Sequence, residues 1–174
     1  MTSRRCILLG FALASALVVA LATGCSPETP ATTENPGPPP AAPTAELTSP
    51  ESSVRSYIDA IGYAYRTARS EEATHAMTLS EWVRVDSYIE LNRIDGRALE
   101  QTLTAFTIRA QSQEGTQAVL AAAEQWKYRY ITMKTGVYDG PWSQASYETT
   151  YTLVNQAQGW LVDRVEAKAL TSVE

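Results

Sequence analysis

Residues 117–133 read QAVLAAAEQWKYRYITM, and this stretch decides the fold. Small or apolar side chains recur at every second position, and aromatic side chains then alternate with charged ones. A period of two is typical of a β-strand, because successive side chains point to opposite faces. The alanine run 121–123 is compatible with a helix, but the flanking alternation and the aromatic residues favour a strand. The expected inner face carries Ala118, Leu120, Ala122, Glu124, Trp126, Tyr128 and Tyr130.

The same alternation recurs on both sides of this stretch. Short polar or glycine-containing segments separate the alternating runs, which is typical of antiparallel strands joined by turns. Further strands are expected from about Leu103, over 143–154 with Tyr147 and Tyr151 on one face, and over 160–168, with turns or loops at 113–116, 136–141 and 155–159.

The register of the central hairpin has two candidates. If Tyr130 opposes Tyr147, then Trp126 opposes Tyr151 and Arg129 opposes Glu148. A slip of one residue would instead place Arg129 opposite Tyr147. The first register pairs aromatic with aromatic and cation with anion, each favourable by roughly 0.2–1 kcal/mol. We therefore expect the first register.

Helical patterns come before the sheet. Thr48, Pro50 and Glu51 predict a capping box at the start of a long amphipathic helix. A second capping box, Thr78 with Glu81, predicts another helix to about Arg93. We also expect a short helix or turn at 70–76, and one more helical turn after Gly96. Helices followed by long antiparallel strands predict an α+β domain over 51–174, with the helices on one face of a curved sheet that forms a cone with a pocket at its open end.

The first residues read as a targeting signal. Arg4 and Arg5 precede an uncharged stretch of residues 7–23, which is too short and too rich in small residues at its end for a full bilayer span. The segment 21–25, LATGC, resembles a bacterial lipobox, in which the cysteine is lipidated and becomes the new N-terminus. The alternative is an ordinary secretory signal with an incidental cysteine. We expect a lipoprotein signal peptide over 1–24 and a lipid anchor on Cys25, which places the domain outside the cytoplasmic membrane.

A tether is expected between the anchor and the domain. Residues 25–50 are rich in Pro, Thr and Ala and show no apolar periodicity, which indicates an extended, disordered segment. Residues 26–174 contain no cysteine, so an exported domain here is stabilised by its own core without a disulfide.

Three stretches carry a resemblance to a known family. They are 123–128, AEQWKY, then 147–153, YETTYTL, then 159–162, GWLV, with residues 57–66 of the first helix also similar. They resemble the IMS domain of plastid and cyanobacterial division proteins, which is similar to the nuclear-transport-factor and ketosteroid-isomerase-like cone fold. The resemblance implies a module that docks other proteins rather than one that catalyses. The division proteins' further domains are absent from this sequence, so a role in division is not implied.

Candidate site residues follow from the aromatic stripe. A pocket or docking surface is expected at Glu124, Trp126, Tyr128, Tyr130, Tyr147 and Tyr151. The plainer interpretation of each aromatic residue is sheet packing, and that of Glu124 is a solvated strand-end carboxylate or an ion pair. Asp163 is the second candidate acid, and His75 is expected in solvent. No catalytic residue is assigned.

Composition excludes several classes of function. The 174 residues are 44% hydrophobic, 9% aromatic and 19% charged, as in soluble globular proteins. The net charge of −5 disfavours nucleic-acid binding, and one His with two Cys leaves too little for a His/Cys metal site. No cofactor is expected.

Two functions stay open at this point. One is a lipoprotein that presents a protein- or peptide-binding domain, with an unknown protein partner. Apolar residues on both sides of the last strand also suggest a second copy against the outer sheet face. The other is a small-molecule-binding protein or a proton-transfer enzyme of the ketosteroid-isomerase-like type, which would use Glu124 and a Tyr in the pocket of the cone. The depth of the pocket separates the two.

Overall fold

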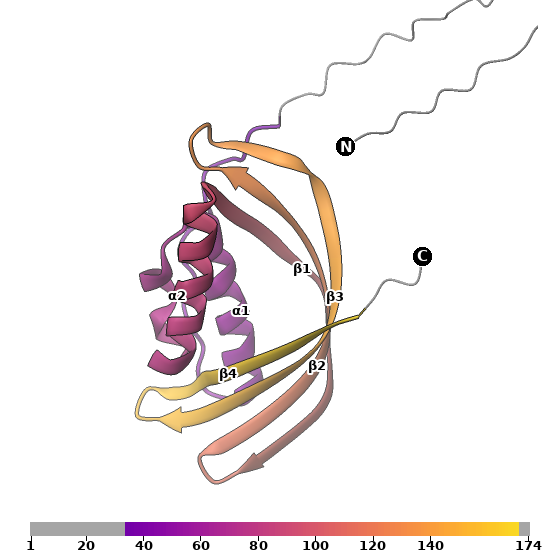
Figure 1. Cartoon of the computed structure of the whole chain (residues 1–174). Helices are drawn as coiled ribbons and strands as arrows, with labels where there is room; N and C mark the ends of the chain where they lie inside the picture. Colours follow the sequence, from indigo (N-terminus) through magenta and orange to yellow (C-terminus); the bar gives the residue numbers. More distant parts are fainter. Residues whose placement is uncertain (1–33, 171–174) are drawn as a thin grey trace, which may run out of the picture. The chain divides into compact units, whose positions relative to one another are not determined.

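The computed structural model describes residues 34–170, which fold into two α-helices, a 3-10 helix and a four-stranded sheet (Figure 1). The expected signal peptide and Cys25 lie outside the described residues. Among these residues, no helix is long and apolar enough to cross a bilayer. The elements are α1 (Pro50–Thr67), η1 (Ser70–Ala76), α2 (Leu79–Ile94), β1 (Arg97–Glu114), β2 (Gln117–Thr132), β3 (Val137–Gln156) and β4 (Gly159–Leu170).

The sheet is an antiparallel meander in the order β1-β2-β3-β4. It curves strongly, and the helices cover its concave face (Figure 1). Val54 and Ile58 of α1 are buried in one core with Leu120 of β2 and Leu153 of β3. This is the α+β cone that the sequence predicts, with the helices packed on a curved antiparallel sheet.

Both long helices begin at a side-chain cap, but the first begins one residue later than expected. Ser49, not Thr48, is the N-cap of α1, and it exchanges hydrogen bonds with Ser52 in a capping box. Glu51 instead forms a salt bridge of 3.0 Å with Arg55, one turn further on. Thr78 caps α2 as predicted, because its side chain accepts a hydrogen bond from the backbone N–H of Glu81.

The expected register of the β2–β3 hairpin is wrong. Tyr147 opposes Glu124 rather than Tyr130, and Trp126 opposes Ala145 rather than Tyr151. The expectation failed because residues 136–141 do not form a loop: β3 starts at Val137, directly after a tight turn. The partner of Tyr147 moves by an even number of residues, so each side chain stays on the face that the alternation predicts.

A bulge explains why a strand runs through Asp139-Gly140-Pro141. Tyr128 pairs with Ser143 and Tyr130 pairs with Asp139, so the three residues 140–142 oppose Arg129 alone. Pro141 has no backbone N–H to donate, and a bulge is a place where a strand tolerates this. The helical turn expected after Gly96 is also absent, because β1 begins at once with Arg97.

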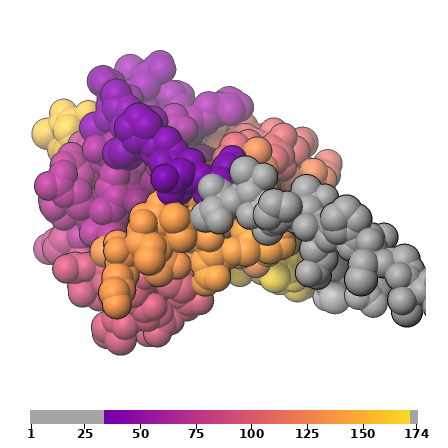
Figure 2. Space-filling model, turned by 90° about the horizontal axis from the view of Figure 1, so that it is seen from above, coloured from indigo at the N-terminus to yellow at the C-terminus, as the bar shows by residue number. Residues whose placement is uncertain are grey.

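Residues 34–49 have no regular secondary structure, yet they lie against the domain (Figure 2). Arg129 Nη1 donates to Glu34 across 2.8 Å, Arg66 Nη2 donates to the Gly37 carbonyl across 2.7 Å, and Trp160 N–H donates to the Leu47 carbonyl across 2.9 Å. The expected free tether therefore does not extend to residue 50. The Glu34 carboxylate pairs with Arg129, and the Leu47 carbonyl accepts from the Trp160 backbone N–H. The composition of this segment does not predict either contact.

The outer face of the sheet is partly covered by the chain itself. The Arg129 guanidinium lies over the rings of Tyr138 and Trp142 and contacts both Glu34 and Glu100. Trp160, Leu161 and Val162 are all buried, and Met77 forms an isolated bridge with Val162. Part of the apolar surface that suggested a second copy is thus used within one chain. A second copy on this face stays a prediction.

Candidate functional site

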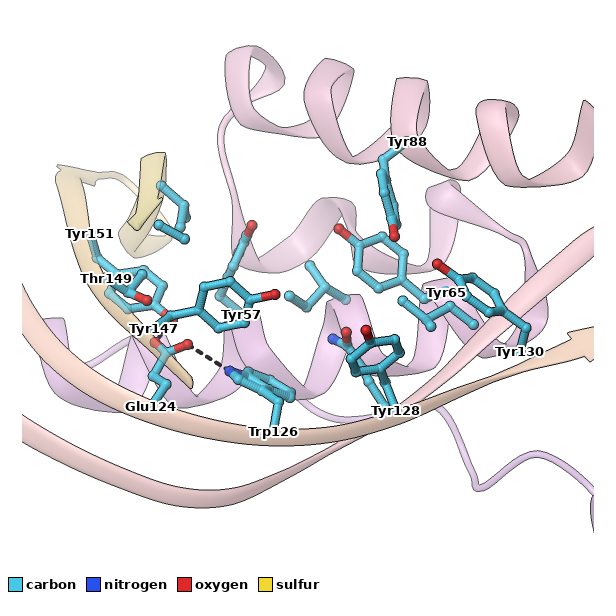
Figure 3. Close-up of a pocket in the computed structure, with 15 residues that line it drawn as sticks. Tyr57, Tyr65, Tyr88, Glu124, Trp126, Tyr128, Tyr130, Tyr147, Thr149 and Tyr151 are labelled. Atoms are coloured by element: carbon cyan, nitrogen blue, oxygen red, sulfur yellow. Dashed lines mark hydrogen bonds between the residues drawn. The ribbon is translucent and has the colours of Figure 1, made fainter. Parts of the chain in front are cut away.

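A cavity of about 530 Å³ lies between the helices and the concave face of the sheet (Figure 3). Small-molecule sites occupy roughly 300–1,000 Å³. Seven tyrosines and Trp126 contribute to its wall, and Glu124 is the one charged residue there. The cone therefore holds an open pocket, which the sequence alone left undecided.

All six residues singled out from the sequence line this cavity. Four of them lie on the inner face of β2: Glu124, Trp126, Tyr128 and Tyr130. The other two, Tyr147 and Tyr151, lie on the same face of the sheet in β3. That they bind a ligand stays a prediction. Sequence reasoning did not assign Tyr57, Tyr65, Tyr88 and Thr149 to the site, although all four line it. Tyr57 and Tyr65 recur at helical spacing, which predicts that they share one face of α1, but this spacing does not identify the strand residues that they face.

Glu124 is buried, with 5% of its surface exposed, so the interpretation as a solvated strand-end carboxylate is wrong. The Tyr151 hydroxyl donates to its Oε1 across 2.5 Å, and the Trp126 indole N–H donates to its Oε2 across 2.7 Å (Figure 3). Burial, followed by the Glu124 charge, raises the pKa of Tyr151 far above its ordinary value. Tyr151 therefore keeps its proton and stays a donor.

A second tyrosine–carboxylate pair lies on the helical side of the cavity. The Tyr57 hydroxyl donates to buried Glu81 across 2.8 Å, and Arg84 contacts the other oxygen of Glu81 at 3.2 Å. Burial raises the pKa of Glu81, while Tyr57 and Arg84 oppose that rise. The rings of Tyr57 and Tyr151 meet edge to face, with centroids 6.1 Å apart, so the two pairs are in contact.

The other end of the cavity is a group of four tyrosine rings (Figure 3). Tyr65 and Tyr88 lie 5.1 Å apart at a tilt of 59°, and Tyr128 and Tyr130 lie 6.3 Å apart and nearly perpendicular. The Arg97 guanidinium lies 4.4 Å from the Tyr130 ring centroid, a cation–π contact. This end therefore already has a protein cation beside it.

Thr149 contributes a buried hydroxyl without a partner. Its side chain lines the cavity, the residue is 2% exposed, and Oγ1 has no hydrogen-bond partner among the described residues. A buried polar atom left unpaired costs about 1–3 kcal/mol. Because this oxygen is buried and lacks a partner, a small shift of the neighbouring side chains would expose to the cavity a group that can bond a ligand.

The remaining candidate residues lie elsewhere. Asp163 accepts a hydrogen bond of 2.8 Å from the Thr78 hydroxyl at the start of α2, and it does not line the cavity. His75 is exposed on η1, as expected. Trp160 is buried in the core at the start of β4. The cavity thus contains one carboxylate, several tyrosine hydroxyls and one free threonine hydroxyl.

Three solved structures are similar to this chain. The intermembrane-space region of the chloroplast protein ARC6 superposes with a TM-score of 0.59 at 14% identity, covering 74% of this chain and 100% of that one. A nuclear transport factor 2-like superfamily protein from Salmonella enterica serovar Typhimurium gives a TM-score of 0.49 at 12% identity, over 70% and 91% of the two chains. A periplasmic fragment of TraM gives 0.49 at 10% identity, over 69% and 98%.

No protein-family model and no curated protein matches the sequence. At these identities the structural likeness shows the fold. The likeness to the ARC6 region confirms the expected α+β cone at the level of the fold. The fold alone does not determine the function.

Proposed function

We propose that this protein is an exported lipoprotein whose cone domain binds a small organic molecule in the aromatic cavity without transforming it. The observation that carries this proposal is the unpartnered Thr149 hydroxyl in the wall of an open cavity. A cone closed by Trp and Tyr would leave no room for a ligand, whereas this one holds about 530 Å³. The pocket therefore favours a small-molecule site over a surface used only for docking.

Binding without catalysis is supported by the hydrogen bonds of Glu124 and by the raised pKa values of the tyrosine hydroxyls in the wall. Each oxygen of Glu124 already accepts a hydrogen bond from the wall. Burial raises the pKa of Tyr57, Tyr65 and Tyr151, so these hydroxyls do not act as bases near neutral pH. Proton transfer needs a base within hydrogen-bond reach of the substrate, with a lone pair free for it. Each Glu124 oxygen keeps a lone pair that can accept from a ligand, but the two hydrogen bonds from the wall hold the carboxylate in place as a fixed acceptor rather than as a mobile proton carrier.

The lipid anchor is the second part of the proposal. It is supported by the apolar stretch 7–23 and the LATGC segment that ends at Cys25. Several acyl chains on one cysteine would hold the domain at the membrane, since each buried CH₂ contributes about 0.8 kcal/mol. The ligand would then be one that reaches the outside of the cytoplasmic membrane.

Peptide docking is the second candidate, and one observation favours it. Pro40 and Pro43, in the proline-rich segment of the chain itself, line a groove together with Ile58, Tyr63 and Trp126. Extended proline-rich segments bind to aromatic grooves at low entropic cost. A partner with a similar segment would compete with Pro40 and Pro43 for this groove, which shares Trp126 with the cavity.

The experiment uses the neutral fluorescent dye N-phenyl-1-naphthylamine with the chain from residue 26 onward, which contains every described residue. Its emission should rise and saturate with wild type. Ala167→Trp, which places a large ring at an exposed position of β4 that lines the cavity, should block the entrance and abolish this rise. Ala110→Trp, the same change at an exposed alanine of β1 outside the wall, should leave it unchanged. Equal dye binding by all three chains would refute the proposal.

A further inference from the structure

We infer that the cavity binds protonated amines that carry an aromatic or alkyl group, with the ammonium group at Glu124 and Thr149 and the apolar group along the tyrosines. This inference rests on the proposed function and names the chemical class of its ligand. It is carried by the charge of the wall, the free hydroxyl and the arrangement of the rings.

The charge of the wall favours a cation. No Lys, Arg or His lines the cavity within residues 34–170, and Glu124 is the one charged residue there. Its two hydrogen-bond donors, Tyr151 and Trp126, are neutral. A buried charge without a counter-charge is unfavourable, and a cationic ligand would supply the counter-charge.

The hydrogen-bonding groups favour an amine with N–H donors. Glu124 opposes Tyr147, and Ala122 opposes Thr149, so Glu124 and Thr149 are diagonal neighbours on one face of the sheet. Figure 3 shows both side chains at the same end of the cavity. An ammonium group has three donors and no acceptor. It can therefore donate to the carboxylate and to the free Thr149 oxygen together.

The rings favour an ammonium group at this end and an apolar group at the other. Trp126 and Tyr147 lie beside Glu124 (Figure 3), and indole is the best aromatic partner for a cation. At the far end, the Tyr130 ring already contacts Arg97, which pairs with Asp95, and among residues 34–170 the cavity wall there has no carboxylate for a second cation. The tyrosine rings at that end offer apolar faces to the remainder of the ligand.

Ligands of the same size but different charge should bind in a fixed order. 2-Phenylethylamine is protonated at neutral pH and satisfies both Glu124 and Thr149. 2-Phenylethanol satisfies Thr149 but leaves Glu124 without a counter-charge. 3-Phenylpropionate places a second carboxylate beside the first and is repelled. The expected affinities therefore fall from the amine to the alcohol to the carboxylate.

Isothermal titration of these three compounds into the chain from residue 26 onward tests the inference. We expect the amine to bind at least tenfold more tightly than the alcohol, and the carboxylate to bind most weakly. Glu124→Gln should weaken binding of the amine at least tenfold and change binding of the alcohol less than twofold. Thr149→Val, a change of similar shape, should weaken both, and circular dichroism of each variant checks that it folds.

The two proposals fail in different ways. If the alcohol or the carboxylate binds as tightly as the amine, or if Glu124→Gln weakens all three equally, the inference about amines is wrong while the cavity still binds ligands. If none of the three binds and N-phenyl-1-naphthylamine also fails to enter, the proposed function itself is wrong. Should Glu124→Gln not fold, an unchanged affinity of Thr149→Val for the amine would still contradict the inference.

Discussion

The Tyr151 hydroxyl donates to Oε1 of Glu124 across 2.5 Å, although the two residues are not paired across the β2–β3 hairpin. Tyr151 opposes Leu120, so its ring reaches along the strand to the carboxylate. With Trp126 on the other oxygen, Glu124 is fixed from two sides by strand residues. A carboxylate held in this way is positioned before any ligand arrives, which reduces the entropic cost of binding.

Thr149→Val should raise the free energy of unfolding by about 1 kcal/mol, because it removes a buried hydroxyl that has no partner. Valine also suits a strand. Urea denaturation measures the change. Thr150→Val, the same change on the other face of β3, should lie within about 0.5 kcal/mol of wild type. A loss of stability in Thr149→Val would show that the hydroxyl does have a partner, and the main support for a ligand site would be gone.

Glu81 should make stability depend on pH. Burial raises the pKa of Glu81 above its unfolded value of 4.5, so the folded state holds the proton more readily than the unfolded state. Its contribution is fully present below the unfolded pKa and is lost as pH rises through the folded pKa. Relative to Glu81→Gln, wild type should therefore gain stability as pH falls from 7 toward 4.5.

Urea denaturation of both chains at several pH values gives this difference. Glu90→Gln, at an exposed residue of the same helix, is the matched control for the substitution itself. If wild type instead loses stability relative to Glu81→Gln as pH falls, then the Tyr57 and Arg84 contacts outweigh burial. The pKa of Glu81 would then be lowered by folding, not raised.

Gly159→Ala should be more destabilising than Gly115→Ala. Both glycines have a positive φ, +116° and +56°, which costs other residues roughly 1–2 kcal/mol. At Gly159 an added Cβ would also lie 2.4 Å from the Leu47 carbonyl oxygen, whereas at Gly115 the space is open. Gly159→Ala should therefore also speed hydrogen exchange of the Trp160 amide, which donates to Leu47. Equal losses of stability and unchanged exchange would show that residues 34–49 do not pack here.

The face of each strand could be predicted from the sequence, and the pairing could not. Alternation places Glu124, Trp126 and Tyr147 on the inner face whatever the register. The candidate site residues are therefore correctly placed on this face although the predicted register of the β2–β3 hairpin is wrong. The error arose at Gly140 and Pro141, which are typical of a loop but here occupy a bulge opposite Arg129. Local sequence does not distinguish the two.

The contacts of Glu124 and Thr149 were beyond prediction for a different reason. Glu124 bonds Tyr151, which is 27 residues away in the sequence, and Tyr57 bonds Glu81 from another helix. Whether these side chains come within hydrogen-bonding distance depends on the curvature of the sheet and on how α1 packs against its concave face. Helix starts, by contrast, are set by neighbouring residues, and Thr78 was correctly predicted as a cap.

Cys25→Ser tests the anchor. Wild type should be found in the membrane fraction, with Cys25 as its first residue and with a mass increased by acyl chains. The variant should keep its signal peptide, because lipid attachment precedes cleavage at a lipobox. A variant that is cleaved at the same position would show that residues 1–24 are an ordinary secretory signal.

The most direct test of the cavity as a ligand site is a titration of the four tryptophan indole N–H signals in a ¹H–¹⁵N spectrum. Each is assigned by a single Trp→Phe variant. With N-phenyl-1-naphthylamine added, the account predicts that the Trp126 signal moves and saturates, because this indole lines the cavity and donates to Glu124. The signals of buried Trp160 and of outer-face Trp142 should stay in place. Movement of Trp142 with Trp126 unchanged would place the ligand on the outer face and contradict the account.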